Sequence, residues 1–125
     1  MDENELAKII VDCCFRIHKN TGPGLLESVY EELLLYELQE QKLECERQVD
    51  LSLNYKDIKI EKGFRADLLV DNKVIVEIKS VENLLPVHKK QLLTYLKLSG
   101  KKLGLLVNFN VDLIKDGITR IVNNL

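Results

Sequence analysis

The sequence predicts one mixed α/β domain, because helical and strand-like patterns share a short chain of ordinary globular composition. The chain has 125 residues, of which 46% are hydrophobic and 30% are charged. A chain of this length folds as a single domain and buries roughly two-thirds of its unfolded surface. Hydrophobic residues recur at helical spacing in residues 5–41 and 86–99, and at period two between these regions. We therefore expect residues 1–125 to form one domain of helices packed on a β-sheet.

Three segments have the spacing of amphipathic helices. The first, residues 5–19, has apolar residues three or four positions apart and stops before a Gly-Pro-Gly turn: Leu6, Ile9, Ile10, Cys13 and Ile17. The second, residues 25–41, has an apolar stripe of Leu26, Val29, Leu33 and Leu34. Its acidic residues are expected to face mostly solvent: Glu31, Glu32, Glu37 and Glu40. The third begins at Pro86 and ends at Gly100.

Strand patterns fill the middle and the end of the chain. Period two from Leu43 to Leu53 predicts a strand, and residues 54–57 supply a turn before a short strand at 58–60. A hairpin of residues 64–80, "FRADLLVDNKVIVEIKS", follows as a separate unit. Residues 103–109 are expected to form a buried strand, and residues 118–122 an edge strand.

The hairpin carries charged residues in an otherwise apolar pattern. A three-residue loop, 71–73, pairs Val70 with Val74 and therefore sets Asp67 opposite Glu77. Period two places Arg65, Leu69 and Lys79 on the same face as these carboxylates. The opposite face is expected to be fully apolar: Leu68, Val70, Val74, Val76 and Ile78.

Two acidic residues directly across a ladder have Cβ atoms roughly 5 Å apart, and their carboxylates repel each other unless a cation lies between them. Ligands with oxygen atoms only, and no nearby His or Cys, suit Mg²⁺ or Mn²⁺. The neighbouring ammonium of Lys79 would position a water or stabilise negative charge on a phosphate. The alternative is a solvent-facing hairpin in which Asp67 pairs with Arg65 or Lys79.

Composition narrows the compartment and the partners. The formal net charge is -2, so the chain lacks the basic field of non-specific duplex binders, and a polyanion must meet a local patch. The candidate patch is a group of lysines around the third helix: Lys89, Lys90, Lys97, Lys101 and Lys102. Three cysteines form neither an even disulfide framework nor a metal knuckle, and no apolar run approaches membrane-spanning length. We expect a cytoplasmic protein.

The segment Gly24-Leu25-Leu26-Glu27-Ser28-Val29-Tyr30 matches the signature of the GxxExxY protein family, a branch of the PD-(D/E)XK nuclease superfamily. The resemblance continues through "RADLLV", "VIVEIKSVE", "QLLTYLKLSG" and "GLLVNF", and it covers most of residues 5–122. It implies a restriction-endonuclease-like core, with a mixed central β-sheet flanked by helices. It also implies a nuclease site that uses Mg²⁺ or Mn²⁺.

Carried over by position, the resemblance implies a set of site residues. Glu27 resembles the acidic residue of the early helix, Asp67 the first strand carboxylate, and Glu77 with Lys79 the Glu-x-Lys pair. Metal binding is therefore expected at Glu27, Asp67 and Glu77. Gln91 and Tyr95 resemble the Gln-x-x-x-Tyr element of exonuclease branches. Ala66 and Phe64 depart from the superfamily's Pro and a frequent Tyr, and neither departure removes a ligand.

One face of the third helix carries three polar side chains, His88, Gln91 and Tyr95, at positions i, i+3 and i+7. On this face, Gln91 would hold a metal-bound water or a phosphate oxygen, and Tyr95 would stack on a base. An exposed helical face is the alternative.

The function that the sequence favours is metal-dependent hydrolysis of phosphodiester bonds in nucleic acid, with DNA and RNA both open. Two alternatives keep the fold: a non-catalytic module that binds nucleic acid or protein, and a subunit active only in a complex. A homo-oligomer or a partner protein is compatible with each of them.

Overall fold

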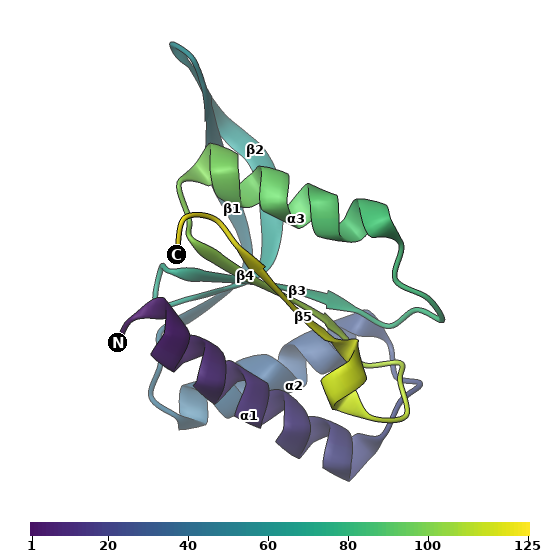
Figure 1. Ribbon diagram of the computed structural model, residues 1–125. Helices are drawn as coiled ribbons and strands as arrows, with labels where there is room; N and C mark the ends of the chain where they lie inside the picture. Colours follow the sequence, from purple (N-terminus) through teal and green to yellow (C-terminus); the bar gives the residue numbers. More distant parts are fainter.

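The computed structural model describes residues 1–125 and shows a five-stranded sheet with helices on both faces (Figure 1). The helices are α1 (Glu3–Thr21), α2 (Glu27–Glu40) and α3 (Pro86–Ser99), with a 3₁₀ turn η1 (Ile114–Gly117). The strands are β1 (Cys45–Tyr55), β2 (Ile58–Val70), β3 (Val74–Lys79), β4 (Leu103–Asn108) and β5 (Ile118–Val122). The expected α/β class is confirmed.

The sheet has the strand order β1-β2-β3-β4-β5 and is mixed. β1, β2 and β3 form an antiparallel meander, whereas β4 lies parallel to β3 and α3 makes the crossover between them. A parallel pair needs such a crossover, since a tight turn can join only antiparallel neighbours. β5 pairs antiparallel with β4 and forms one edge, as its sequence predicted.

Two unequal cores lie on the two faces of the sheet. α1 and α2 cover one face, where 20 buried residues form the main core. α3 covers the other face over a cluster of 7 buried residues. The expected apolar face of the hairpin belongs to the main core: Leu68, Val70, Val74, Val76 and Ile78. Cys13 and Cys14 are buried there too, as small core residues.

The apolar stripe of α2 differs from the sequence prediction. The helix begins at Glu27 rather than at residue 25, so Leu26 occupies the N-cap position and is 72% exposed. The buried apolar positions are Tyr30, Leu34 and Leu38. Tyr30 stacks on Phe109 with 4.3 Å between the ring centroids. This rotation of the stripe turns Glu31 inward to an exposure of only 5%, where solvent exposure was expected.

β2 is one long strand, and the expected short strand at 58–60 and the hairpin strand from residue 64 are its two parts. Gly63 lies between these two parts. A Cβ at this position would collide with the side chain of Leu53 on β1, so that glycine fits here and a larger residue does not. The β1–β2 hairpin therefore extends beyond the rest of the sheet as an arm (Figure 1). Tyr55 and Ile58 pair at its tip and are exposed.

The β1–β2 pair also exchanges its two faces part-way along its length. In β1, Cys45 packs against the main core, whereas Val49 and Leu51 pack against the α3 cluster, although all three have the same parity. The exchange coincides with Gln48, whose φ of 53° is left-handed. Period two alone predicts a strand here but not this reversal.

None of the helices combines the length and the apolar composition that spanning a bilayer requires.

Candidate active site

The β2–β3 hairpin brings Asp67 and Glu77 together. Its register is the predicted one, with Val70 opposite Val74 and Leu68 opposite Val76. Beyond Leu68 the two carboxylates replace regular ladder hydrogen bonds. The backbone N–H of Ile78 donates to Asp67 Oδ2 at 2.8 Å, and the N–H of Asp67 donates to Glu77 Oε2 at 3.4 Å. The strands therefore separate where the acidic residues stand.

Glu77 lies in an environment that disfavours its charge. Burial is the main cause that raises the pKa of Glu77 to about 9, and the negative charge of Asp67 is the next. The ammonium of Lys79 opposes the rise but does not cancel it. At neutral pH the metal-free protein thus keeps a proton on Glu77, and this proton relieves the repulsion expected between the two carboxylates.

A cavity of about 180 Å³ between the sheet and α3 contains most of the predicted site. Five of the expected site residues line it: Asp67, Glu77, Lys79, Gln91 and Tyr95. Arg65 and His88 complete its polar lining. α3 therefore presents its polar face to the carboxylates, as the spacing of His88, Gln91 and Tyr95 predicted.

The aromatic residue of this cavity, Tyr95, is held in place by a neighbouring ring. The ring of Tyr95 stacks on Phe64 with 3.9 Å between the centroids and 12° between the planes. Phe64 itself is buried in the α3 cluster. One face of Tyr95 is thus covered by Phe64 and is closed to a ligand. Burial, followed by the charge of Glu77, raises the pKa of Tyr95.

His88 has a structural contact at the start of α3. Its Nδ1 accepts a hydrogen bond from the backbone N–H of Leu85 at 3.2 Å. This bond satisfies one of the free N–H groups at the helix start and fixes which ring nitrogen carries no proton.

Glu27 lies outside this cavity. It lines a separate hollow with Ser80 and Asn110, and its Oε2 accepts a hydrogen bond from the N–H of Ser80 at 3.1 Å. Ser80 also donates its hydroxyl to Leu25 O at 2.7 Å, so the start of α2 is tied to the end of β3. No group of three or more His, Cys, Asp or Glu side chains with the geometry of a metal site is present.

The sequence did not single out Gln48, which lies beside Asp67, or Glu31, the buried carboxylate that Gln48 contacts. Gln48 Nε2 lies 2.9 and 3.0 Å from the two carboxylate oxygens of Glu31 and 3.4 Å from Asp67 Oδ1. Glu31 also accepts from Arg47 Nε at 2.6 Å. The sequence carried no signal for this contact, because the helical pattern assigned Glu31 to solvent and nothing marks Gln48 as left-handed.

The lysines around α3 divide between its two ends. Lys89 and Lys90 are exposed in its first turns, near His88 and Gln91. Lys101 follows its last turn and donates to Asn72 O at 2.9 Å, at the closed end of the β2–β3 hairpin. The expected patch is therefore split, and only Lys89 and Lys90 lie at the helix end that carries site residues.

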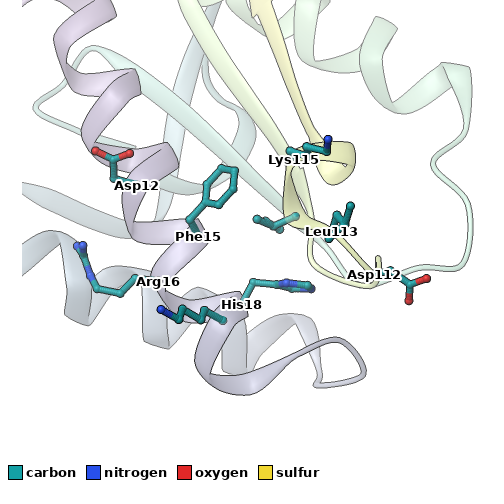
Figure 2. A pocket seen from close by; sticks show the side chains of 9 residues that line it. Asp12, Phe15, Arg16, His18, Asp112, Leu113 and Lys115 are labelled. Carbon is teal, nitrogen blue, oxygen red and sulfur yellow. The ribbon is translucent and has the colours of Figure 1, made fainter.

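A larger cavity, of about 590 Å³, lies elsewhere, between the second half of α1 and the loop that leads into η1 (Figure 2). Phe15 and Leu113 form apolar parts of its wall, and Asp12, Arg16 and Lys115 charged parts. His18 Nε2 donates to Val111 O at 2.8 Å and links the two sides. None of the predicted site residues lies in it.

Comparison with known families agrees with the architecture. The family model of the PD-(D/E)XK nuclease superfamily matches residues 4–121, nearly the whole chain, and the protein belongs to this superfamily. No curated protein and no solved structure matches the chain. The mixed five-stranded sheet with three helices is consistent with the nuclease fold.

Proposed function

We propose that this protein is a metal-dependent nuclease that hydrolyses phosphodiester bonds of nucleic acid. One observation carries the proposal: Asp67 and Glu77, with Glu77 destabilised as an anion, share a cavity with Lys79. Membership in a nuclease superfamily supports the same chemistry. A perturbed carboxyl beside a second carboxyl in a cleft is typical of functional sites.

The donor set fits Mg²⁺ or Mn²⁺. Mg²⁺ is commonly bound through one or two carboxylates, with water and substrate phosphate completing the shell. Asp67 and Glu77 supply these carboxylates, and no sulfur ligand lines their cavity. The one imidazole in the cavity, that of His88, already accepts a hydrogen bond at Nδ1 from the N–H of Leu85. We retain Glu27 as a third acidic residue of the proposed metal site. Its carboxylate accepts a hydrogen bond from the N–H of Ser80, the residue after Lys79.

Each polar side chain of the cavity has a separate role in the proposed hydrolysis. The bound cation would acidify the attacking water and neutralise charge that develops on the phosphate. Lys79 places a positive charge beside that water and the phosphate. Gln91, with donor and acceptor atoms on one amide, orients a water or a phosphate oxygen. Tyr95, which lines the cavity, would stack on a base with the face opposite Phe64.

The experiment that tests this function is incubation with labelled single- and double-stranded DNA and RNA in the presence of Mg²⁺, Mn²⁺ or EDTA. We expect cleavage with metal and none with EDTA. Glu77→Ala and Lys79→Ala should each abolish cleavage while circular dichroism stays native. Glu61→Ala and Lys62→Ala, which change exposed residues outside the cavity, are the matched controls. Equal cleavage by wild type and both site variants would refute the proposal.

Measurements of metal binding distinguish the proposed role of Glu77 from that of Lys79. Glu77→Ala should lose Mn²⁺ binding in calorimetry, whereas Lys79→Ala should keep it, because an ammonium is not a ligand. A wild type that binds nucleic acid but neither binds Mn²⁺ nor cleaves any substrate would instead be a binding module with the nuclease fold.

A further inference from the structure

The proposed function leaves a buried acidic residue on α2 without a role. Glu31 is 5% exposed and lies among the apolar side chains of the helix. A buried carboxylate is costly unless charges and hydrogen bonds compensate for the lost water. Glu31 has both, through Arg47 Nε at 2.6 Å and Gln48 Nε2 at 2.9 and 3.0 Å.

The backbone of Gln48 is strained to make this contact. Its φ of 53° is left-handed, a conformation that is unfavourable for a residue with a Cβ. Its neighbours Arg47 and Val49 pair regularly with Leu68 and Ala66 on β2. Asp67 is the residue of β2 that lies between those two partners. Strain that persists within a paired strand is typical of residues held in place for a function.

The side chain of Gln48 reaches the candidate site. Its Nε2 lies 3.4 Å from Asp67 Oδ1, while Oδ2 of the same carboxylate accepts from the N–H of Ile78 at 2.8 Å. The two oxygens of Asp67 therefore have separate donors. An amide nitrogen carries two hydrogens, so that one Gln48 side chain can serve Glu31 and Asp67 together.

We propose that Gln48 is a positioning residue that orients the Asp67 carboxylate for the cation, and that Glu31 and Arg47 hold Gln48 in place. This inference rests on the proposed function of Asp67 as a ligand. The Gln48 amide lies between two carboxyl groups, where its hydrogens offset their repulsion. Groups that orient a ligand in this way typically change metal affinity or activity by 10- to 100-fold.

The variant that tests the proposal is Gln48→Gly, which removes the amide and also relieves the left-handed backbone. We expect the dissociation constant for Mn²⁺, measured by calorimetry on the metal-free protein, to rise roughly 10- to 100-fold. In the metal-free protein, glycine accepts this φ without strain, but Glu31 loses the two contacts to the Gln48 amide, so the change in melting temperature has two opposed contributions. A purely structural bond would change the melting temperature and leave the Mn²⁺ affinity unchanged.

Lys56→Gly is the matched control. Lys56 has the same φ of 53° but lies in the turn at the tip of the β1–β2 arm, outside the cavity. It should reproduce the effect of glycine on the melting temperature and leave Mn²⁺ affinity unchanged. In cleavage assays, Gln48→Gly should lower kcat at saturating metal more than it raises KM for nucleic acid. Wild-type Mn²⁺ affinity in Gln48→Gly would overturn the proposal.

A second measurement keeps this inference separate from the proposed function. If wild type binds no Mn²⁺, the metal-site proposal fails, and a double-mutant cycle of Gln48→Gly and Asp67→Asn in EDTA decides whether Gln48 holds Asp67. Non-additive shifts in melting temperature would support the contact between the two side chains. Additive shifts would overturn it.

Discussion

At the scale of the residue, Glu77 makes the stability of the metal-free protein depend on pH. The folded state raises the pKa of Glu77 from an ordinary value near 4.5 to about 9. The unfolded chain therefore releases this proton at lower pH than the folded chain does. Stability linked to Glu77 is fully present below about pH 4.5 and is lost as pH rises toward about 9.

We predict that the free energy of unfolding in EDTA falls across this interval, by at most about 1.4 kcal/mol per pH unit. Urea titrations at several pH values measure it. Glu77→Gln, which is neutral throughout, should flatten the slope. An identical slope in the two proteins would show that Glu77 titrates normally in the folded state.

The proton on Glu77 should also make metal binding depend on pH. A cation that binds Glu77 must displace the proton which the site holds at neutral pH. Mn²⁺ affinity should therefore increase from pH 6.5 to pH 8.5. At pH 7 the calorimetric heat should change with the ionisation enthalpy of the buffer, corresponding to about one proton released per ion. A heat that is independent of the buffer would contradict protonation of Glu77.

At the scale of the element, the position of α3 depends on one close contact. Gly104 on β4 faces Leu92 of α3, and a Cβ at Gly104 would lie 2.9 Å from Leu92 Cδ2. Gly104→Ala is expected to destabilise the protein by roughly 1–3 kcal/mol, because the core must accommodate the extra methyl group. Chemical denaturation checks this value.

The double variant Gly104→Ala with Leu92→Ala is the control. Removing the side chain that the new methyl group would meet should make the combined loss smaller than the sum of the single losses. A strictly additive result would mean that the strain lies elsewhere. Because α3 also carries Gln91 and Tyr95, Gly104→Ala should disturb the cavity as well as the core.

Most elements could be predicted from local chemistry. Pro86 and Gly100 mark the ends of α3, and the three-residue loop 71–73 determines the register that brings Asp67 to Glu77. The stripe of α2 was harder to predict: Leu26 lies at the N-cap and is exposed, and Glu31 lies on the buried side of the helix. Tertiary packing determines which side of α2 is buried, and the helical period of the sequence alone does not predict that side.

The grouping of the candidate site residues was predictable to the extent that it follows from strand alternation and helix spacing. Asp67, Glu77 and Lys79 follow from the hairpin register, and Gln91 and Tyr95 from a polar helix face. Gln48 does not, because a left-handed residue inside a strand has no signature in composition or period. The resemblance grouped Glu27 with Asp67 and Glu77, whereas the structure places it in the neighbouring hollow.

At the scale of the whole molecule, the two faces of the sheet differ in the amount of core they hold. The α1–α2 side buries 20 residues in one cluster and the α3 side 7. Local opening free energies follow buried apolar contact. We predict that amides of α3 exchange with deuterium through an opening of lower free energy than those of α1. Native-state hydrogen exchange resolved by segment measures both, and equal protection of the two helices would contradict the prediction.

The parallel pairing of β3 with β4 has a consequence for the order of folding. The β1–β2–β3 meander closes through short turns, whereas β4 reaches β3 only after the whole α3 segment has been enclosed in a loop. Closing a long loop is entropically slower than closing a short one. The two carboxylates are thus expected to meet early in an exposed hairpin, and the helix that completes their cavity arrives later. During that interval the apolar edge of β3 lacks a neighbouring strand. The protein is therefore expected to aggregate when it refolds at high concentration.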